Sequence, residues 1–347
     1  MNALPLVSVN MIAYNRAEYI RDAIDSILAQ DYENLELVII DDGSTDETIS
    51  VVKAYKNKKI ILHKNEGNKG IAYSRNKAVS ISTGEFILIL DSDDIAHENL
   101  ISKKIKFLIS NPDYVGVSNL MTYINGQGKI LSTGNGIRIA DSEIPFYLFF
   151  SNCLVQSSIM LRSGVLKNNF YNEGVKSEDY DLWIRIIGLG KFHIIHEDLV
   201  KVRFHRENST STPLHDPNEG MLNVIKSNLI LLDMASTDES LRLHRSFLDS
   251  SVKFTIEEFE NFIIYINRVL LKKFSGYIFG SEQLEGFIIK RLAMKIKTNL
   301  KSLEIFTLWK KIFTIKINRS FRNNILLMLQ KLMKDKIIGI KNKFSCA

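Results

Sequence analysis

The stretch Phe86–Asp94 reads FILILDSDD and decides the fold. Its five apolar residues follow Thr83-Gly84-Glu85, and a short apolar run of this kind is typical of a strand buried in a parallel sheet. The strand runs directly into Asp91, Asp93 and Asp94. Ligands of open α/β sheets bind at the carboxyl ends of the strands, so we expect this acidic stretch to lie at a binding site.

The acidic stretch has two interpretations. Carboxylates this close together repel one another unless a cation lies between them. The divalent cations Mg²⁺ and Mn²⁺ prefer carboxylate, water and phosphate oxygens, so a metal site is the first interpretation. A solvated acidic turn that begins the next helix is the second, and the stretch alone leaves both open.

Strands and helices alternate through the first part of the chain. Short apolar runs predict strands at Leu6–Ala13, Leu35–Ile40, Ile60–His63 and Phe86–Leu90. Helical spacing of apolar residues predicts helices at Tyr19–Leu28, from Ser44 to about Tyr55, and at Ile71–Ser80. This alternation indicates βαβ units and a parallel sheet. Farther along, we expect a helix from Asn99 to Asn111 and short strands at Tyr114–Ser118, Leu120–Ile124, Ser157–Leu161 and Asp198–Val202.

The other strand ends also carry polar groups. Tyr14 and Asn15 follow the first strand, and Asp41 and Asp42 follow the second. An aromatic ring, hydrogen-bond acceptors and a metal on one edge suit the base, ribose and pyrophosphate of a nucleotide diphosphate. Each residue also has a simpler interpretation: Tyr14 as a half-buried aromatic, and the two aspartates as favourable charges at a helix N-terminus.

Local motifs refine this picture. Asn15 with Glu18, and Ser44 with Glu47, have the spacing of helix capping boxes. The glycine-rich loop Asn65–Gly70 is not a phosphate-binding P-loop, because the Gly-Lys-Ser/Thr ending is absent.

Four motifs together resemble family 2 glycosyltransferases of the GT-A fold. They are Val7-Ser8-Val9 with Tyr14-Asn15, Ile40-Asp41-Asp42-Gly43-Ser44-Thr45-Asp46, Gly70-Ile71-Ala72-Tyr73-Ser74-Arg75-Asn76, and Gly84 with Leu90-Asp91-Ser92-Asp93-Asp94. Their order and spacing match over about Leu6 to Ser211. The resemblance implies metal-dependent transfer of a hexose from a nucleotide-diphosphate donor, often a UDP-sugar, with inversion at the anomeric carbon. The implied acceptor is a hydroxyl of a glycan or lipid-linked molecule in bacterial surface-polysaccharide biosynthesis.

The resemblance also implies roles for individual residues. Tyr14 and Asp42 fall where the family contacts the base, and Arg75 falls in a motif near the donor diphosphate. Asp91 is expected near the ribose and the metal, and Asp93 at the metal-binding second acid of the Asp-x-Asp motif, with Mn²⁺ or Mg²⁺ as the cofactor. The role of Asp94 stays open.

A second chemical site is expected at Ser177–Trp183, which reads SEDYDLW and resembles the family's Glu-Asp…Trp motif. There Asp179 serves as the catalytic base, with Glu178 as a supporting group or acceptor contact. An acid at a helix N-terminus is partly stabilised as the anion, which keeps it available as a base. Asp181 is expected to face solvent. The simpler interpretation of the motif is an ordinary acidic helix start.

The segment Arg203–Ser209 resembles the part of the family that closes the donor site, where a histidine approaches the metal or the diphosphate. His205, between Arg203 and Arg206, is therefore a further candidate metal ligand. A lone histidine is more often an ordinary core or surface residue.

Composition limits the class of protein. Hydrophobic content of 45% and charged content of 24% are ordinary for a globular chain. The two cysteines, Cys153 and Cys346, have no ligand-like spacing, so we expect no disulfide framework, no zinc site and a reducing compartment. Met1–Val9 lacks the features of a signal peptide, and no apolar run approaches the roughly 18–20 residues of a membrane span. The expected location is the cytoplasm.

The charge is unevenly distributed. Residues 261–347 hold 18 basic and 4 acidic residues, whereas the remaining chain holds 27 basic and 35 acidic. We therefore expect a GT-A domain at 1–215 and a basic, mainly helical region at 216–347. Basic helices with apolar residues favour an anionic membrane surface, here the inner face of the plasma membrane, or a partner subunit; packing against the catalytic domain is the simpler interpretation. Nucleic-acid binding is not expected, because no recognisable nucleic-acid module occurs.

The same residues can be compared with the motifs of other functions. A nucleotidyltransferase would have a glycine- and lysine-rich loop after the first strand, and a haloacid-type phosphatase would carry its Asp-x-Asp motif there. A non-catalytic sugar-nucleotide binding module is also compatible with the upstream motifs, although the intact Asp179 argues against it.

Overall fold

The computed structural model describes residues 4–205, 217–231, 237–249, 251–271 and 281–344. The chain forms two compact units. The first comprises Met1–Ile144 and Asn152–Met221, and the second comprises Pro145–Ser151 and Leu222–Ala347. A short segment from the middle of the chain thus joins the second unit, which hydrophobic patterning did not indicate.

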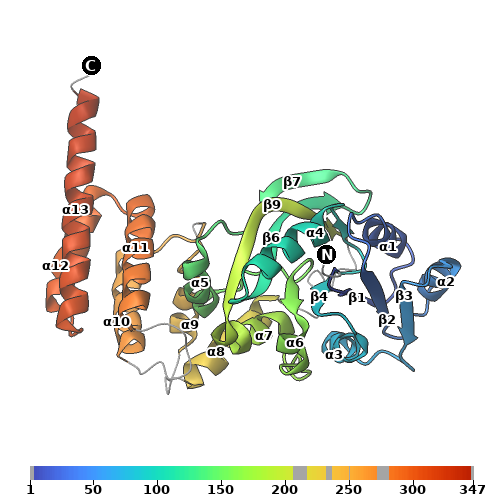
Figure 1. Ribbon diagram of the computed structural model, residues 1–347. Coiled ribbons are helices and arrows are strands. Elements are labelled where there is room, and N and C mark those ends of the chain that lie inside the picture. The colour runs from blue at the N-terminus through green and yellow to red at the C-terminus, as the bar shows by residue number, and fades with distance from the viewer. Residues whose placement is uncertain (1–3, 206–216, 232–236, 250, 272–280, 345–347) are drawn as a thin grey trace. The chain divides into compact units, whose positions relative to one another are not determined.

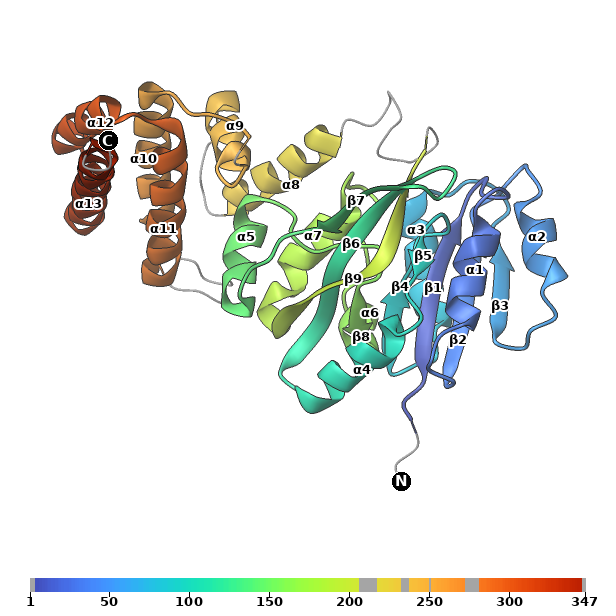
Figure 2. The ribbon, with the colours of Figure 1, turned by 90° about the horizontal axis from the view of Figure 1, so that it is seen from above.

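The first unit is built on one sheet of nine strands (Figures 1 and 2). The strands are β1 (Val7–Ala13), β2 (Leu35–Asp41), β3 (Ile60–Lys64), β4 (Phe86–Ile89), β5 (Ile95–Ala96), β6 (Tyr114–Asn125), β7 (Ile130–Asn135), β8 (Met160–Arg162) and β9 (Lys191–Phe204). Their order is β3-β2-β1-β4-β8-β6-β9-β5, with β7 paired to β6. The expected α/β class is therefore confirmed.

The amino-terminal half of this sheet is parallel. β1 lies between β2 and β4, with Ala13 opposite Asp41 and Asn10 opposite Ile89. These strands are almost entirely buried, as their continuous apolar sequences predicted. The shared register brings the carboxyl ends of β1, β2 and β4 to one edge, where the polar residues of the predicted site follow.

Helices cover both faces of the parallel strands. On one face, α1 (Ile20–Leu28), α2 (Thr48–Ala54) and α4 (Leu100–Ser110) share an apolar core with every second residue of β1. On the other face, Ala78 of α3 (Ile71–Ile81) packs against Val38 and Ile40 of β2. The unit also contains α6 (Ser163–Lys167), α7 (Glu178–Ile186) and two short 3₁₀ turns at Asp141–Glu143 and Ile187–Leu189.

The strand predicted in two pieces at Tyr114–Ser118 and Leu120–Ile124 is one continuous strand, β6. Its pairing with the parallel neighbour β9 shifts register at Asn119 and Leu120. This irregularity falls where the prediction placed a break, so the pattern located a bulge rather than a strand end.

The two predicted capping boxes are wrong, because their residues join neighbouring loops instead of capping their own helices. Neither α1 nor α2 has a side-chain cap. Ser44 Oγ accepts a hydrogen bond from the Asn15 amide at 2.9 Å, and Asn15 Oδ1 accepts one from the Thr45 amide at 2.9 Å. Asp46 likewise accepts from the Ala17 amide at 3.0 Å. The loops after β1 and β2 are therefore bound to each other.

The second unit is helical. Its elements are α5 (Ile144–Phe150), α8 (Pro217–Leu231), α9 (Asp238–Ser246), α10 (Ile256–Leu270), α11 (Ser281–Asn299), α12 (Ser302–Thr314) and α13 (Arg319–Phe344). Buried His244 joins three of them, contacting the Phe149 carbonyl and the Tyr265 hydroxyl, both at 2.7 Å. Burial lowers the pKa of His244 to about 4, so this histidine is neutral and structural. None of the helices in the described ranges is long and apolar enough to cross a membrane.

The close approach at Gly43 gives a test of the loop arrangement. Gly43 has φ of +82°, and an added Cβ would lie 2.5 Å from the Gly67 carbonyl carbon. We expect Gly43→Ala to lower the free energy of unfolding by about 2 kcal/mol, because left-handed strain and a backbone clash act together. Chemical denaturation measures this change. Gly67→Ala is the matched control, since a Cβ there meets nothing within 4 Å; equal stability of the two variants would contradict the expectation.

Candidate active site

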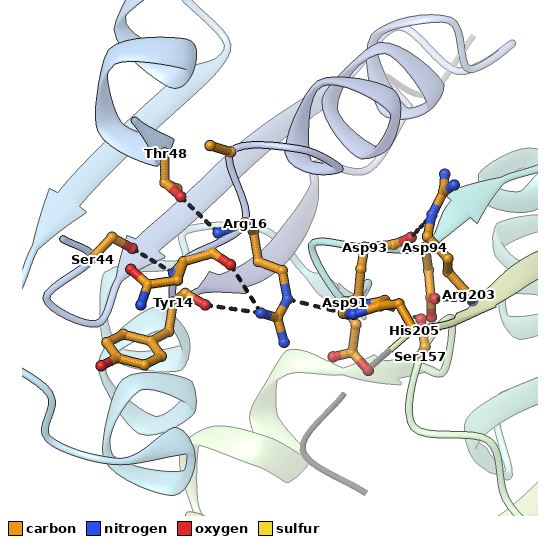
Figure 3. A network of polar contacts seen from close by, with 12 residues as sticks. Tyr14, Arg16, Ser44, Thr48, Asp91, Asp93, Asp94, Ser157, Arg203 and His205 are labelled. Carbon is orange, nitrogen blue, oxygen red and sulfur yellow. Dashed lines mark hydrogen bonds and ion pairs between the residues drawn. The ribbon is translucent and has the colours of Figure 1, made fainter. Parts of the chain in front are cut away.

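Asp93 lies at the centre of the polar edge (Figure 3). Arg16 Nε donates to its Oδ2 at 3.2 Å, and His205 Nε2 lies 2.9 Å from the same oxygen. Burial raises the pKa of Asp93, but the His205 hydrogen bond and the Arg16 charge outweigh it and lower the pKa overall. Asp93 is therefore an anion held in place from both sides.

Asp91 is paired with a different cation. Arg75 Nη2 lies 3.4 Å from Asp91 Oδ1, and Arg75 Nη1 lies 3.3 Å from Glu178 Oε1 without hydrogen-bond geometry. Burial lowers the pKa of Arg75, but Glu178 and Asp91 outweigh it and raise the pKa, so the guanidinium stays charged. One buried cation thus connects Asp91, predicted near the ribose and the metal, to Glu178, which lies beside the predicted catalytic base Asp179.

The three predicted metal ligands are not gathered into a preformed cluster. Asp93 and His205 are in contact, whereas Asp91 is paired with Arg75. Within the residues that the structure describes, no three histidine, cysteine or acidic side chains converge so as to hold an ion. The chemistry of the set still fits a hard cation, because burial and the neighbouring Asp93 raise the pKa of Asp91 against the opposing Arg75 charge. A cation bound beside Asp91 and Asp93 would relieve the repulsion between their two carboxylates.

Asp94, whose role the sequence left open, anchors the end of β9. Its buried carboxylate accepts from the Arg203 amide at 2.9 Å. The Arg203 side chain donates to the carbonyls of Asp93 and Gly126 and to the Asp22 carboxylate. Arg203, which flanks the candidate ligand His205, therefore has a structural role in the described part of the chain; Arg206 lies outside the described residues.

Asp42 organises the glycine-rich loop. Its buried carboxylate accepts from Asn65 Nδ2 at 2.8 Å and from the amides of Lys69 and Gly70 at 2.9 and 3.0 Å. Tyr14, at the end of β1, is 42% exposed, so its ring is accessible. The contacts of Tyr14 and Asp42 with the base of the nucleotide stay predictions. The structure adds a role for Asp42 in holding the glycine-rich loop.

Asp179 lies in the first turn of α7, beside Glu178. Asn152 Nδ2 donates to Asp179 Oδ2 at 2.9 Å. Burial and the Glu178 charge raise the pKa of Asp179 to about 6, against lowering effects from Arg75, the Tyr180 amide and Asn152. The expected stabilisation of the anion by the helix N-terminus is therefore outweighed. A carboxyl with a pKa near 6 remains mostly ionised at neutral pH and is well matched to proton abstraction.

A pocket of about 390 Å³ collects four of the predicted residues: Arg75, Asp91, Glu178 and Asp179. Its remaining walls come mainly from the start of α3 and from the loop before α7, and they include Lys69, Tyr73, Gln156, Glu173 and Lys176. The volume falls within the range of small-molecule sites. Tyr14, Asp42, Asp93 and His205 do not line this pocket.

Sequence reasoning missed a buried lysine behind the site. Lys104 of α4 is fully buried, and its Nζ donates to the carbonyls of Val117 and Ser158 at 3.0 and 2.5 Å. Ser158 has φ of +86°, and the preceding Ser157 Oγ accepts from the Asp91 amide at 3.3 Å. Lys104 therefore holds the turn that supports the acidic stretch.

Arg16 and Asn152 were also missed, although each contacts a candidate catalytic or metal-binding acid. Arg16 had one signal, since it follows the first strand at the same edge as Tyr14. Asn152 had none, because its partner is 27 residues away.

The fold of the chain is shared with known structures. TarS of S. aureus (residues 1–349, in complex with UDP-GlcNAc) superposes with a TM-score of 0.53 over 96% of this chain and 92% of that chain, at 17% identity. The fold is therefore GT-A, as the motifs implied, with an additional helical region.

Sequence comparison gives the family. Residues 8–165 match the family described as Glycosyl transferase family 2. The uncharacterized glycosyltransferase MJ1057 of Methanocaldococcus jannaschii is 38% identical over 214 residues, which cover 60% of this chain and 74% of that protein. The UDP-Glc:alpha-D-GlcNAc-diphosphoundecaprenol beta-1,3-glucosyltransferase WfaP of Escherichia coli is 34% identical over 189 residues, which cover 54% of this chain and 72% of that protein. The chain belongs to glycosyltransferase family 2.

The raised pKa of Asp179 predicts a specific pH dependence. A base works only when deprotonated, so kcat/KM should be full above about pH 6 and fall about tenfold per pH unit below it. Asn152→Leu removes a donor that stabilises the anion, and should move this acid limb to higher pH. A pH–rate profile of both proteins measures the shift.

Asn168→Leu is the control for this profile, because Asn168 is exposed at the end of α6. An acid limb that stays in place in Asn152→Leu, or that lies near the ordinary aspartate value of about 4, would contradict the assignment.

Proposed function

We propose that this protein is a metal-dependent, inverting hexosyltransferase that moves a sugar from a UDP-sugar to a hydroxyl of a glycan or lipid-linked acceptor. The observation that carries the proposal is the position of Arg75. Its guanidinium lies between Asp91 and Glu178, so the acidic stretch and Asp179 share one pocket. The proposed donor-side residue Asp91 and the proposed catalytic base Asp179 therefore line the same pocket.

In the proposed reaction, Asp179 accepts the proton of the acceptor hydroxyl. The acceptor oxygen attacks the anomeric carbon while the bond to the donor diphosphate breaks, and this single displacement inverts the anomeric configuration. Arg75 keeps a fixed positive charge beside the reacting groups, and Asn152 holds the orientation of the Asp179 carboxylate.

Asp93 is the proposed principal metal ligand, with Asp91 and His205 beside it. Mn²⁺ or Mg²⁺ bound there would offset the charge of the leaving diphosphate. The fit rests on the donor set, since carboxylates and an imidazole suit Mn²⁺ and the acids around Asp93 are crowded. Tyr14 and Asp42 remain the proposed base contacts.

The donor and acceptor classes follow from a relative. WfaP is named for UDP-Glc as donor and a diphosphoundecaprenol-linked sugar as acceptor, and this chain covers 72% of it. A lipid-linked acceptor would place the reaction at a membrane surface, which agrees with the basic helical region. We therefore propose peripheral attachment at the inner face of the plasma membrane and a role in surface-polysaccharide biosynthesis.

The first test is turnover with a panel of nucleotide sugars, read as UDP or GDP release in the presence of Mn²⁺ and lipid-linked acceptors. Asp179→Asn keeps the side-chain shape but cannot accept the proton, so kcat should fall by about 10²–10⁴-fold with donor affinity nearly unchanged. Asp181→Asn is the control on the same helix, because Asp181 pairs with Arg185. Normal turnover of Asp179→Asn would assign the base to another group, and no turnover with any donor would favour a binding module.

The second test addresses the metal. Asp93→Ala should abolish Mn²⁺-dependent binding of the nucleotide, measured by calorimetry, while circular dichroism shows a retained fold. Asp113→Ala is the control, since Asp113 is exposed and pairs with Lys191. Unchanged Mn²⁺-dependent affinity in Asp93→Ala would remove Asp93 from the metal site.

A further inference from the structure

Helix α12 is amphipathic in an unusual way, because it has apolar residues on two faces. Its inner face buries Ile305, Leu308 and Ile312 in the helical unit. Its outer face exposes Leu303, Phe306 and Phe313, which are 75%, 38% and 51% accessible. Burial in the unit therefore accounts for only one of the two apolar faces.

The exposed residues form a continuous stripe. Leu303, Phe306, Lys310 and Phe313 follow one another at intervals of three, four and three residues, which places them on one side of a helix. Trp309 lies beside the stripe and is partly buried, with its indole nitrogen turned away from solvent. It is stacked on Phe306 at 6.0 Å between ring centroids and lies edge-on to Phe313 at 4.7 Å. We call Leu303, Phe306, Trp309, Lys310 and Phe313 the α12 ridge.

Positive charge surrounds the α12 ridge. Residues 301–319 hold five basic side chains, at positions 301, 310, 311, 316 and 319, and a single acidic one, Glu304. Lys311 is paired with Glu260 of α10. Lys310 Nζ lies 4.5 Å from the centroid of the Phe306 ring, so a cation and an aromatic face meet at the surface itself. Tryptophan, phenylalanine and lysine together on one helix face are typical of helices that lie in a membrane interface.

We propose that the α12 ridge is the membrane-contacting surface of this protein, and that it binds bilayers containing anionic lipids. The aromatic side chains enter the boundary between headgroups and acyl chains, while the surrounding lysines meet lipid phosphates. The proposal specifies the surface behind the peripheral attachment proposed above. The α12 ridge lies entirely within the helical unit, so membrane binding through it does not depend on the chemistry of the catalytic unit.

A second copy of the chain fits the ridge less well than a membrane does. Two ridges meeting across a two-fold axis would bring five basic side chains against five others. On each side these are offset by Glu304 and by Glu260, which pairs with Lys311. Four apolar side chains on one helix also cover far less than the roughly 1,000 Å² expected of a stable protein interface. Anionic lipid provides both the opposite charge and the apolar environment.

The test uses the full chain and vesicles of phosphatidylcholine with or without phosphatidylglycerol. The protein should float with anionic vesicles at low salt and detach near 1 M salt, where the screening length shortens to about 3 Å. Phe306→Ser and Phe313→Ser should each weaken the partition coefficient by about tenfold or more, and Lys310→Gln by about fivefold. Leu327→Ser is the matched control, because Leu327 is exposed on the neighbouring helix α13.

Trp309 provides a direct readout of insertion. The chain has two tryptophans, and the other, Trp183, is fully buried. Brominated lipids should therefore quench the emission of the wild-type protein, and this quenching should disappear in Trp309→Phe. Absence of quenching in the wild type, or equal flotation of Phe306→Ser and wild type, would overturn the proposal.

Two further measurements distinguish membrane binding by the ridge from self-association and from the transferase activity. If the phenylalanine variants change oligomeric state by light scattering, the ridge is a self-association surface and the proposal fails. If they lose vesicle binding but retain UDP release with a detergent-solubilised acceptor, the membrane proposal holds independently of the transferase proposal. Asp179→Asn should show the reverse: retained flotation and lost turnover.

Discussion

The buried Arg75 guanidinium is the interaction on which the site depends. A charge that is almost fully removed from water is stable only beside opposite charges, and Arg75 has Asp91 on one side and Glu178 on the other. The two acids come from opposite ends of the catalytic sequence motifs, 87 residues apart in the chain. The requirement to neutralise one cation therefore fixes the distance between the acidic stretch and helix α7.

The acids of the stretch Asp91–Asp94 also repel one another. Asp94 is the clearest case, because burial and its neighbours Asp93 and Asp91 raise its pKa well above the ordinary value. Its hydrogen bond from the Arg203 amide converts the crowded acid into an anchor for β9. Lys104 has a comparable role behind the turn, where two backbone carbonyls bind a fully buried amine. Structural polar groups and candidate catalytic groups are therefore parts of one network.

Much of the first unit could be predicted because its strands are buried on both faces. Continuous apolar runs located β1, β2 and β4, and the polar residues after them located the edge of the sheet.

Lys104 could not be predicted in this way, since a lysine in an amphipathic helix normally faces solvent and its partners lie 13 and 54 residues away. The capping-box error has a related cause: Asn15 and Ser44 satisfy the spacing for a local cap, but three-dimensional proximity gives them partners in the adjacent loop. The pKa of Asp179 depends on burial and on Glu178, which spacing alone does not reveal.

The hydrogen bonds between the loops after β1 and β2 have a consequence for protein engineering. The Asn15 amide donates to Ser44, and the Asn15 side chain accepts from the Thr45 amide. Gly43 touches the backbone at Gly67, and Asp42 accepts from the amides of Lys69 and Gly70. Three loops that are separate in sequence thus form one cooperative block. Chimeras with other members of the family, made to transplant donor preference, should recombine these loops as a set, since a single transplanted loop would arrive without its partners.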